Sequence, residues 1–305
     1  MKIVSLLPSA TEIVYALGLG GDLIGVTDEC DFPPDAVTKP VVSRSALPQG
    51  RPHSSLEIDR AVRERMDAKE PLYVLDTELI RREQPDVILT QDLCRVCAVP
   101  TGEVKEALAS LGLSDDTKVI SLDPHSLEDV IAQLEIVGGL LGEGDRGAEL
   151  SSSLRARVAA VKEKARRLPT IGVFCLDWWE PPFVAGHWVP EMVEAVGASN
   201  LLIEKGEPSH TVTHREIRDA MPEVIVFMPC GYYLEEAEAE AEALLAHPEI
   251  ADTPAARNGN VFAVDATSFF SRPGPRLVEG LEILAWAVHP EAYPQPPNGS
   301  IVRLR

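Results

Sequence analysis

Short apolar runs alternate with amphipathic segments along the whole chain, and this alternation limits the possible folds more than any other feature. The expected strands are residues 3–7, 23–26, 87–90 and 118–122 in the first half, and residues 170–176, 224–228 and 261–264 in the second. Helical segments separate them, and strands that alternate with helices predict parallel sheets covered by helices. The stretch QPDVIL at 84–89 resembles MPEVIV at 221–226, so the two halves share one plan.

A segment with helical periodicity and no strand character joins the two halves. Its apolar positions recur every three or four residues: Leu150, Leu154, Val158, Val161, Ala165 and Leu168. This spacing predicts one amphipathic helix over residues 145–168, roughly 36 Å long. The predicted fold is therefore α/β, with two Rossmann-like lobes at residues 1–144 and 169–305. Each lobe has a mainly parallel sheet, and a single long connecting (spine) helix joins them.

Charge and hydropathy exclude some partners. The formal net charge of −20 argues against nucleic acid, because phosphate binding needs clustered Lys and Arg. No apolar run reaches the ~18 residues of a membrane-spanning helix, so we expect no membrane insertion. The opening MKIVSLLPSATE lacks the apolar stretch of a secretory signal. We expect a cytoplasmic protein if Met1 is the native start, and a periplasmic or cell-surface protein if the chain was trimmed.

The five cysteines occupy similar places in this pattern. Cys30, Cys94, Cys97, Cys175 and Cys230 are each expected at or just beyond the carboxyl end of a strand. In open α/β sheets, ligands bind outside those ends. The CxxC pair could bind a metal, cycle as a redox pair, contact a ligand or only pack.

A metal site would need further ligands beside the CxxC pair. We consider Cys30 as a third thiolate with Cys94 and Cys97, and His187 or His53 as a fourth ligand. Structural zinc sites commonly have two CxxC pairs, whereas this chain has one.

Aromatic residues gather behind the strands of the second half. They form only 5% of the chain, yet three of the four tryptophans lie between Trp178 and Trp188. Phe183, Tyr232 and Phe269 also follow expected strands. An aromatic-walled cleft with a few polar anchors suits a large, flat, partly apolar ligand.

No catalytic constellation is present in the sequence. We find no GxSxG elbow, HExxH motif or phosphate-binding loop, so a binding protein is expected rather than an enzyme. His210 and His214 are four residues apart, but the intervening Thr-Val-Thr is a poor helix former and we do not predict a metal pair. His247 is expected at the surface.

Several motifs in order resemble those of a known family. They are LPSATE at 7–12, LIGVT at 23–27, CDFPP at 30–34, QPDVI at 84–88, PFVAG at 182–186, GASNLL at 197–202 and FFSRPGPR at 269–276. Together they resemble the helical-backbone (class III) solute-binding proteins that serve ABC importers, and most closely the cobalamin-binding branch. The segment LCRVCAVP at 93–100 resembles a subgroup usually labelled cobalamin-binding.

The resemblance implies two Rossmann-like lobes joined by one long helix, with the ligand in the cleft between them. The predicted ligand is cobalamin or a related corrinoid, bound rather than used in catalysis. The aromatic candidates to contact it are Trp178, Trp179, Phe183, Trp188 and Phe269. The hydrogen-bonding candidates are Ser9, Thr27, Gln91 and Tyr232. Cys30, Cys94 and Cys97 could approach the cobalt, and His187 and Arg276 complete the candidate set.

Two other functions remain open from the sequence. The chain could bind another metal chelate, such as haem or an iron-siderophore, with Arg276 near its anionic groups. It could also be a cytoplasmic thiol-dependent redox or corrinoid-processing enzyme that cycles a Cys94–Cys97 disulfide. If the protein is exported, an ABC importer permease is the expected partner.

Overall fold

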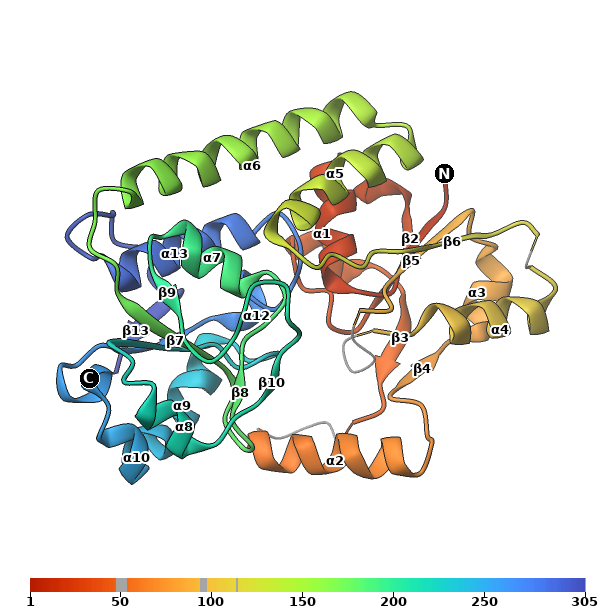
Figure 1. The fold of residues 1–305 in the computed structure, drawn as a ribbon. Helices are drawn as coiled ribbons and strands as arrows, with labels where there is room; N and C mark the ends of the chain where they lie inside the picture. The colour runs from red at the N-terminus through yellow and green to blue at the C-terminus, as the bar shows by residue number, and fades with distance from the viewer. Residues whose placement is uncertain (48–53, 94–97, 114, 305) are drawn as a thin grey trace. The chain divides into compact units, whose positions relative to one another are not determined.

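The computed structural model describes residues 1–47, 54–93, 98–113 and 115–304 (Figure 1). The chain forms two compact units. Unit 1 comprises Met1–Arg51, Arg60–Pro124 and Ile131–Ser151, and unit 2 comprises Pro52–Asp59, His125–Val130 and Ser152–Arg305. Each unit contains a sheet with parallel central strands and surrounding helices, and one long helix, α6 (Gly144–Ala165), has residues in both. The predicted α/β architecture is confirmed.

Unit 1 has a six-stranded sheet in the order β4-β3-β2-β1-β5-β6. Its strands are β1 (Ile3–Ser5), β2 (Leu23–Thr27), β3 (Val41–Ser45), β4 (Tyr73–Leu75), β5 (Val87–Thr90) and β6 (Lys118–Ser121). Its helical segments are α1 (Pro8–Ala16), η1 (Gly20–Asp22), η2 (Pro34–Thr38), α3 (Thr77–Glu83) and α4 (Thr101–Leu111). Helices α2 (Ser55–Asp67) and α5 (Leu127–Leu141) have residues in both units. Among the described strands of unit 1, β3 and β4 form the one antiparallel pair.

Both faces of the unit 1 sheet are buried. Ile3 and Leu89 pack in one core cluster with residues of α1 and the later part of α5. Val4 and Ile88, their chain neighbours, pack in another with residues of α3 and α4. Successive side chains of a strand point to opposite faces, so a continuous apolar run buries both.

Unit 2 has a sheet in the order β10-β8-β7-β11-β12-β13, with β9 also paired to β7. Its strands are β7 (Gly172–Trp178), β8 (Phe183–Val184), β9 (Ser199–Asn200), β10 (His210–Thr211), β11 (Val224–Phe227), β12 (Val261–Val264) and β13 (Ile301–Arg303). Its helices are α7 (Val189–Ala195), α8 (His214–Asp219), α9 (Leu234–Ala246), α10 (Pro248–Ala251), α11 (Pro254–Arg257), α12 (Ala266–Phe269) and α13 (Leu277–Val288). The central strands β7, β11 and β12 are parallel.

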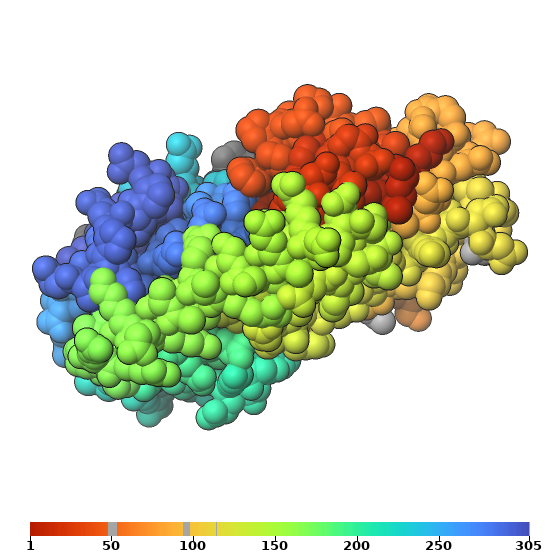
Figure 2. All heavy atoms as spheres, turned by 90° about the horizontal axis from the view of Figure 1, so that it is seen from above, coloured from red at the N-terminus to blue at the C-terminus, as the bar shows by residue number. Residues whose placement is uncertain are grey.

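The segment after α13, and α13 itself, pack against the second part of α6 within unit 2. Tyr293 donates a hydrogen bond of 3.0 Å to the carbonyl of Val161, and the Lys164 ammonium lies 4.6 Å from the centre of the Tyr293 ring. Arg157 donates two hydrogen bonds, of 2.9 and 2.8 Å, to the Glu282 carboxylate of α13. Figure 2 shows this terminal segment, in dark blue, against the green helix.

Among the residues that the structure describes, no helix has the length and apolar character to cross a bilayer.

The start of α1 differs from a simple sequence interpretation. The motif Ser9-Ala10-Thr11-Glu12 has the form of a capping box, with Ser9 as the cap. In the structure the helix begins at Pro8, and Leu7 is the N-cap residue without a side-chain hydrogen bond. The capping-box interpretation is wrong because a proline in the first turn, whose φ already suits a helix, moves the start upstream.

Helices α5 and α6 approach closely at Gly147, and this contact can be tested. A Cβ at Gly147 would lie 2.4 Å from the carbonyl oxygen of Leu134. We expect Gly147→Ala to reduce the free energy of unfolding by about 1–3 kcal/mol, because the two backbones must separate. The matched control is Gly139→Ala, where nothing lies within 4 Å of the added Cβ. It should raise stability by up to ~1 kcal/mol. Urea unfolding of both variants measures this, and equal effects would contradict the close approach.

Candidate functional site

The predicted site residues of unit 1 that the structure describes lie at or just after the ends of β1, β2 and β5, and all four are buried. Ser9, Thr27 and Cys30 are each less than 5% exposed. The Thr27 hydroxyl accepts a hydrogen bond of 3.1 Å from the backbone N–H of Glu29. The Cys30 sulfur lies 3.1 Å from the Thr11 hydroxyl and 3.5 Å from that of Thr27. Thr27 and Cys30 thus stabilise the turn after β2, and Cys30 also belongs to the apolar core.

Gln91 follows β5 directly and has an unsatisfied acceptor. Its side chain is 5% exposed, and its Oε1 atom is buried without a hydrogen-bond partner among the described residues. A buried acceptor without a partner costs free energy. Among the described unit 1 candidates, Gln91 therefore has a free acceptor atom that a ligand could use for a hydrogen bond.

Two aspartates hold the residues on either side of the CxxC segment. The Asp123 carboxylate accepts hydrogen bonds of 2.6 and 2.9 Å from the backbone N–H groups of Asp92 and Leu93. Asp92 accepts one of 2.8 Å from the N–H of Thr101. Hydrogen bonds from Thr101 hold the pKa of Asp92 below its usual range. Cys94 and Cys97 themselves, and His53, lie outside the described residues, so the thiolate metal site stays a prediction.

In unit 2, three of the predicted aromatic residues lie together. We call Trp178, Phe183 and Tyr232 the aromatic face. The rings of Trp178 and Tyr232 meet edge to face, with centroids 5.6 Å apart. Phe183 is paired with Trp178 across β7 and β8. Trp178 and Phe183 are half-buried, and Tyr232 is buried with a pKa raised by desolvation, so its hydroxyl keeps its proton.

Two other predicted tryptophans are buried away from this face. Trp179 is 3% exposed and packs edge-on against the rings of His214 and His247. Trp188 is 6% exposed, and its indole N–H donates a hydrogen bond of 2.8 Å to the carbonyl of Phe270. Their partners lie within unit 2, and ligand contact by either stays a prediction.

Phe269 and Arg276 occupy a different part of unit 2. The Arg276 guanidinium lies 5.9 Å from the centre of the Phe269 ring. Phe269 lines a pocket of about 400 Å³ together with Val161, Lys164 and Tyr293. This pocket belongs to α6, α13 and the end of the chain, so the structure does not place Phe269 on the aromatic face.

His187 is held in a turn with positive φ. Its φ is 56°, and its backbone N–H donates a hydrogen bond of 2.8 Å to the carbonyl of Glu207. Burial lowers the pKa of its imidazole, which favours the neutral ring. The centroids of the His187 and Trp188 rings are 5.7 Å apart.

The expected position of Cys175 was wrong. It lies in the middle of β7, pairs with Val226 of β11 and is 5% exposed. The strand extends to Trp178 rather than ending at residue 176, which moves Cys175 from the strand end into the core. Burial raises the pKa of its thiol, so it is an unreactive packing residue. Cys230, after β11, is exposed.

Asp177 is a further candidate that sequence reasoning missed. It is the penultimate residue of β7, directly before Trp178 of the aromatic face. Desolvation raises the pKa of its carboxyl to about 6, and a hydrogen bond with Ser209 opposes that rise. Ser209 also accepts a hydrogen bond of 3.0 Å from the N–H of Gly186. In the sequence, the residue could have been recognised as an acidic side chain near the end of an otherwise apolar strand.

The family model for periplasmic binding proteins matches residues 3–267. The chain belongs to this family. It is a non-enzymatic solute-binding protein of the kind that serves ABC importers. The predicted family and the predicted absence of enzymatic activity are confirmed by this match.

Curated relatives of this periplasmic binding protein share about a quarter of its residues. A vitamin B12-binding protein of Vibrio cholerae is 24% identical over 284 residues, covering 92% of this chain and 86% of that protein. The ABC transporter substrate-binding lipoprotein YvrC of Bacillus subtilis is 23% identical over 298 residues, covering 96% and 81%.

Solved structures of the family have the same fold. The haem-binding protein RhuT of Roseiflexus has a TM-score of 0.70 and 25% identity, covering 95% of this chain and 98% of that one. The vitamin B12 binding protein BtuF of Vibrio cholerae has a TM-score of 0.67 and 21% identity, covering 94% and 96%.

Asp177 gives a testable pH dependence. Its pKa is about 6 in the folded protein and near 3.8 when unfolded. The unfolded chain releases this proton first, so the residue destabilises the protein as pH rises from ~4 to above ~6. We expect Asp177→Asn to be more stable than the parent by up to about 3 kcal/mol at pH 8, and nearly equal at pH 4. Urea unfolding across this range measures the difference, and a constant difference would contradict the desolvated carboxyl.

Proposed function

We propose that this solute-binding protein binds cobalamin or a related corrinoid through the aromatic face of unit 2. The observation that carries the proposal is the edge-to-face pair of Trp178 and Tyr232, in which Trp178 is half-buried and keeps part of its aromatic surface exposed. Aromatic side chains contribute large contact areas against flat ligands at a low cost in conformational entropy. The vitamin B12-binding relative of Vibrio cholerae supports the same ligand class.

Haem is the alternative ligand, because structural neighbours such as RhuT are haem-binding proteins. Charge favours the corrinoid. Haem carries two anionic propionates, whereas the corrin ring carries amide groups that donate hydrogen bonds. Asp177 directly precedes Trp178 in β7, and the whole chain has a net charge of −20. A carboxylate accepts hydrogen bonds from amides and repels propionates.

We also propose that the protein delivers its ligand to an ABC importer permease. One relative is a substrate-binding lipoprotein of such a transporter, and BtuF is periplasmic. The permease receives solute on the outer side of the membrane, so the proposal requires the protein there. Fractionation of cells that express the full gene tests this, and retention of all the protein in the cytoplasm would contradict it.

The ligand can be identified by optical titration of the reduced protein with cobalamin, cobinamide and haem. We expect saturable binding of both corrinoids and weaker binding of haem, because the net charge of −20 disfavours the anionic propionates of haem. Haem binding tighter than that of either corrinoid would reverse the assignment. Absence of binding by all three would reject the metal-chelate class.

The aromatic face can be tested by truncation. We expect Trp178→Ala and Tyr232→Ala each to weaken corrinoid binding about 10–100-fold, since buried aromatic contacts commonly contribute 2 kcal/mol or more. Trp286→Phe is the control, because Trp286 of α13 packs edge-on against Phe262 of β12 and belongs to no candidate set. An unchanged affinity in both truncations, measured by the same titration, would remove the aromatic face from the site.

The role of the CxxC pair can be separated from that of the aromatic face. If Cys94 or Cys97 reaches the cobalt, bound cobalamin should show a shifted visible band that the Cys94→Ser/Cys97→Ser double variant lacks. An identical spectrum and affinity in parent and variant would show that the thiols do not ligate the metal.

A further inference from the structure

Two histidines and a glutamate gather on unit 2, outside the aromatic face. His214 is the first residue of α8, His247 lies between α9 and α10, and Glu249 is in α10. The two imidazole rings are stacked, with centroids 4.0 Å apart and an interplanar angle of 21°. One ligand atom from each of the three residues lies within 4.8 Å of the other two. His247 lies between two helices, as the sequence suggested, and is half-buried.

The buried nitrogens of both rings lack partners. His214 Nε2 and His247 Nδ1 are inaccessible to solvent and have no hydrogen bond among the described residues. Such atoms are uncommon, because each costs the free energy of its lost hydration. Desolvation and the neighbouring His247 lower the pKa of His214, so its ring is neutral and its lone pair available. Neutral imidazole is the form that binds metals.

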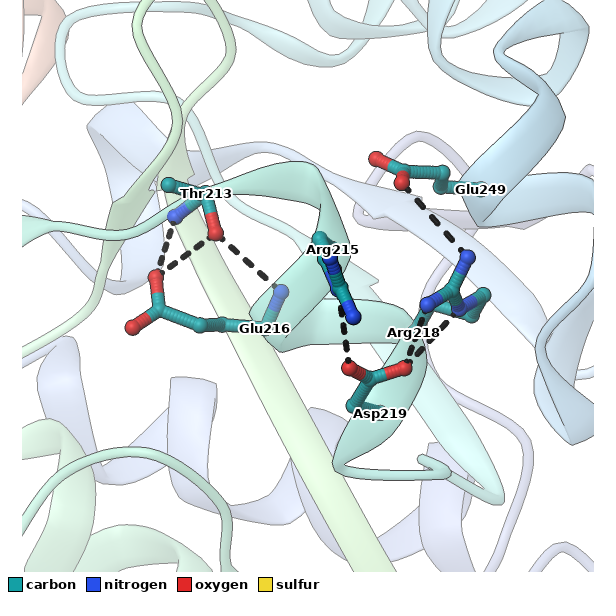
Figure 3. A network of polar contacts seen from close by, with 6 residues as sticks. All are labelled: Thr213, Arg215, Glu216, Arg218, Asp219 and Glu249. Atoms are coloured by element: carbon teal, nitrogen blue, oxygen red, sulfur yellow. Dashed lines mark hydrogen bonds and ion pairs between the residues drawn. The ribbon is translucent and has the colours of Figure 1, made fainter.

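The surrounding residues hold the three side chains in place. Thr213 and Glu216 form a capping box that fixes the first turn of α8, where His214 begins the helix. Figure 3 shows Arg218 between the carboxylates of Asp219 and Glu249, with contacts of 2.6 and 3.6 Å. An arginine that holds one carboxylate oxygen leaves the other for a cation. Partners of this kind orient the ligands in metal sites.

Trp179 packs against both histidines from the apolar core. Its ring centroid lies 4.8 Å from that of His214 and 5.7 Å from that of His247, edge-on in each case. The apolar surface on this side excludes water from the ring nitrogens. It also gives the cluster an intrinsic optical probe, since the fluorescence of an indole responds to a nearby metal ion.

We propose that His214, His247 and Glu249 form a binding site for a divalent transition-metal ion, with Zn²⁺ as the best match. Two imidazole nitrogens and a carboxylate oxygen are a common zinc ligand set, which water completes to four. A metal lies in the plane of each imidazole that binds it, and two stacked rings cannot both point at one ion. Binding therefore requires one ring to turn and breaks the stack.

The site would connect two parts of unit 2. His214 begins α8, and His247 and Glu249 lie at the junction of α9 and α10, so a bound ion would cross-link these helices. An ion that binds only the folded protein stabilises it. This inference is independent of the corrinoid proposal, because the cluster does not include the aromatic face.

The test uses the full chain with Cys94→Ser and Cys97→Ser, so that these thiols do not compete for the metal. We expect calorimetric titration with Zn²⁺ to show saturable binding of about one ion and thermal unfolding to shift upward by several degrees. Co²⁺ should give the visible absorption of a four-coordinate site. Cu²⁺ should quench tryptophan fluorescence, and Trp179→Phe should lose most of that quenching. Absence of saturable binding by all three ions would overturn the proposal.

Substitutions of the proposed ligands test which side chains bind the Zn²⁺ ion. We expect His214→Ala and Glu249→Gln each to weaken Zn²⁺ binding by at least ~100-fold, more than the loss of a residue that only orients a ligand. His210→Ala is the matched control, because His210 is exposed on the neighbouring strand β10 and should leave binding unchanged. Circular dichroism verifies that each variant folds. Glu249→Gln is the milder of the two substitutions, because it removes no ring that packs against Trp179. Equal affinity in parent and Glu249→Gln, or equal losses in His210→Ala and His214→Ala, would overturn the assignment.

Discussion

Parallel strand pairing requires each sheet to be covered by helices on both faces, and this burial determines where polar side chains can lie. Val4 and Ile88 pack on one face of the unit 1 sheet, and Ile3 and Leu89 pack on the other. Polar side chains are therefore rare inside the central strands, such as β5 and β11, and are found where strands end. Gln91, whose Oε1 has no hydrogen-bond partner among the described residues, and Asp177, with its desolvated carboxyl, both lie at such ends.

The strands and the long helix could be predicted because their apolar patterns are strong. The expected strand at residues 87–90 is β5, and the helix expected at 145–168 is α6, which runs from Gly144 to Ala165. The pattern missed β3 and β4, since β3 contains Ser43 and Arg44 and β4 has only three residues. Of the two, β4 is a short strand at the edge of the sheet, and such a strand buries little, so its sequence carries little signal.

The candidate site was harder to predict because neighbours in the chain point in different directions. Trp178 contributes to the aromatic face, whereas Trp179, the next residue, is buried against His214 and His247. The sequence also could not show that α8 and the α9–α10 junction bring two histidines together, since no local spacing records that contact. Cys175 was misplaced for a related reason, since the polar Asp177 concealed that β7 continues to Trp178.

The position of the cobalt relative to the aromatic face is the most direct test of the account. Crystals of the protein grown with cobalamin, measured on both sides of the cobalt absorption edge, would locate the metal by its anomalous signal. The account predicts one strong peak, with the corrin ring against Trp178 and Tyr232. A corrinoid bound elsewhere on the protein, with both rings free of contact, would contradict the central claim.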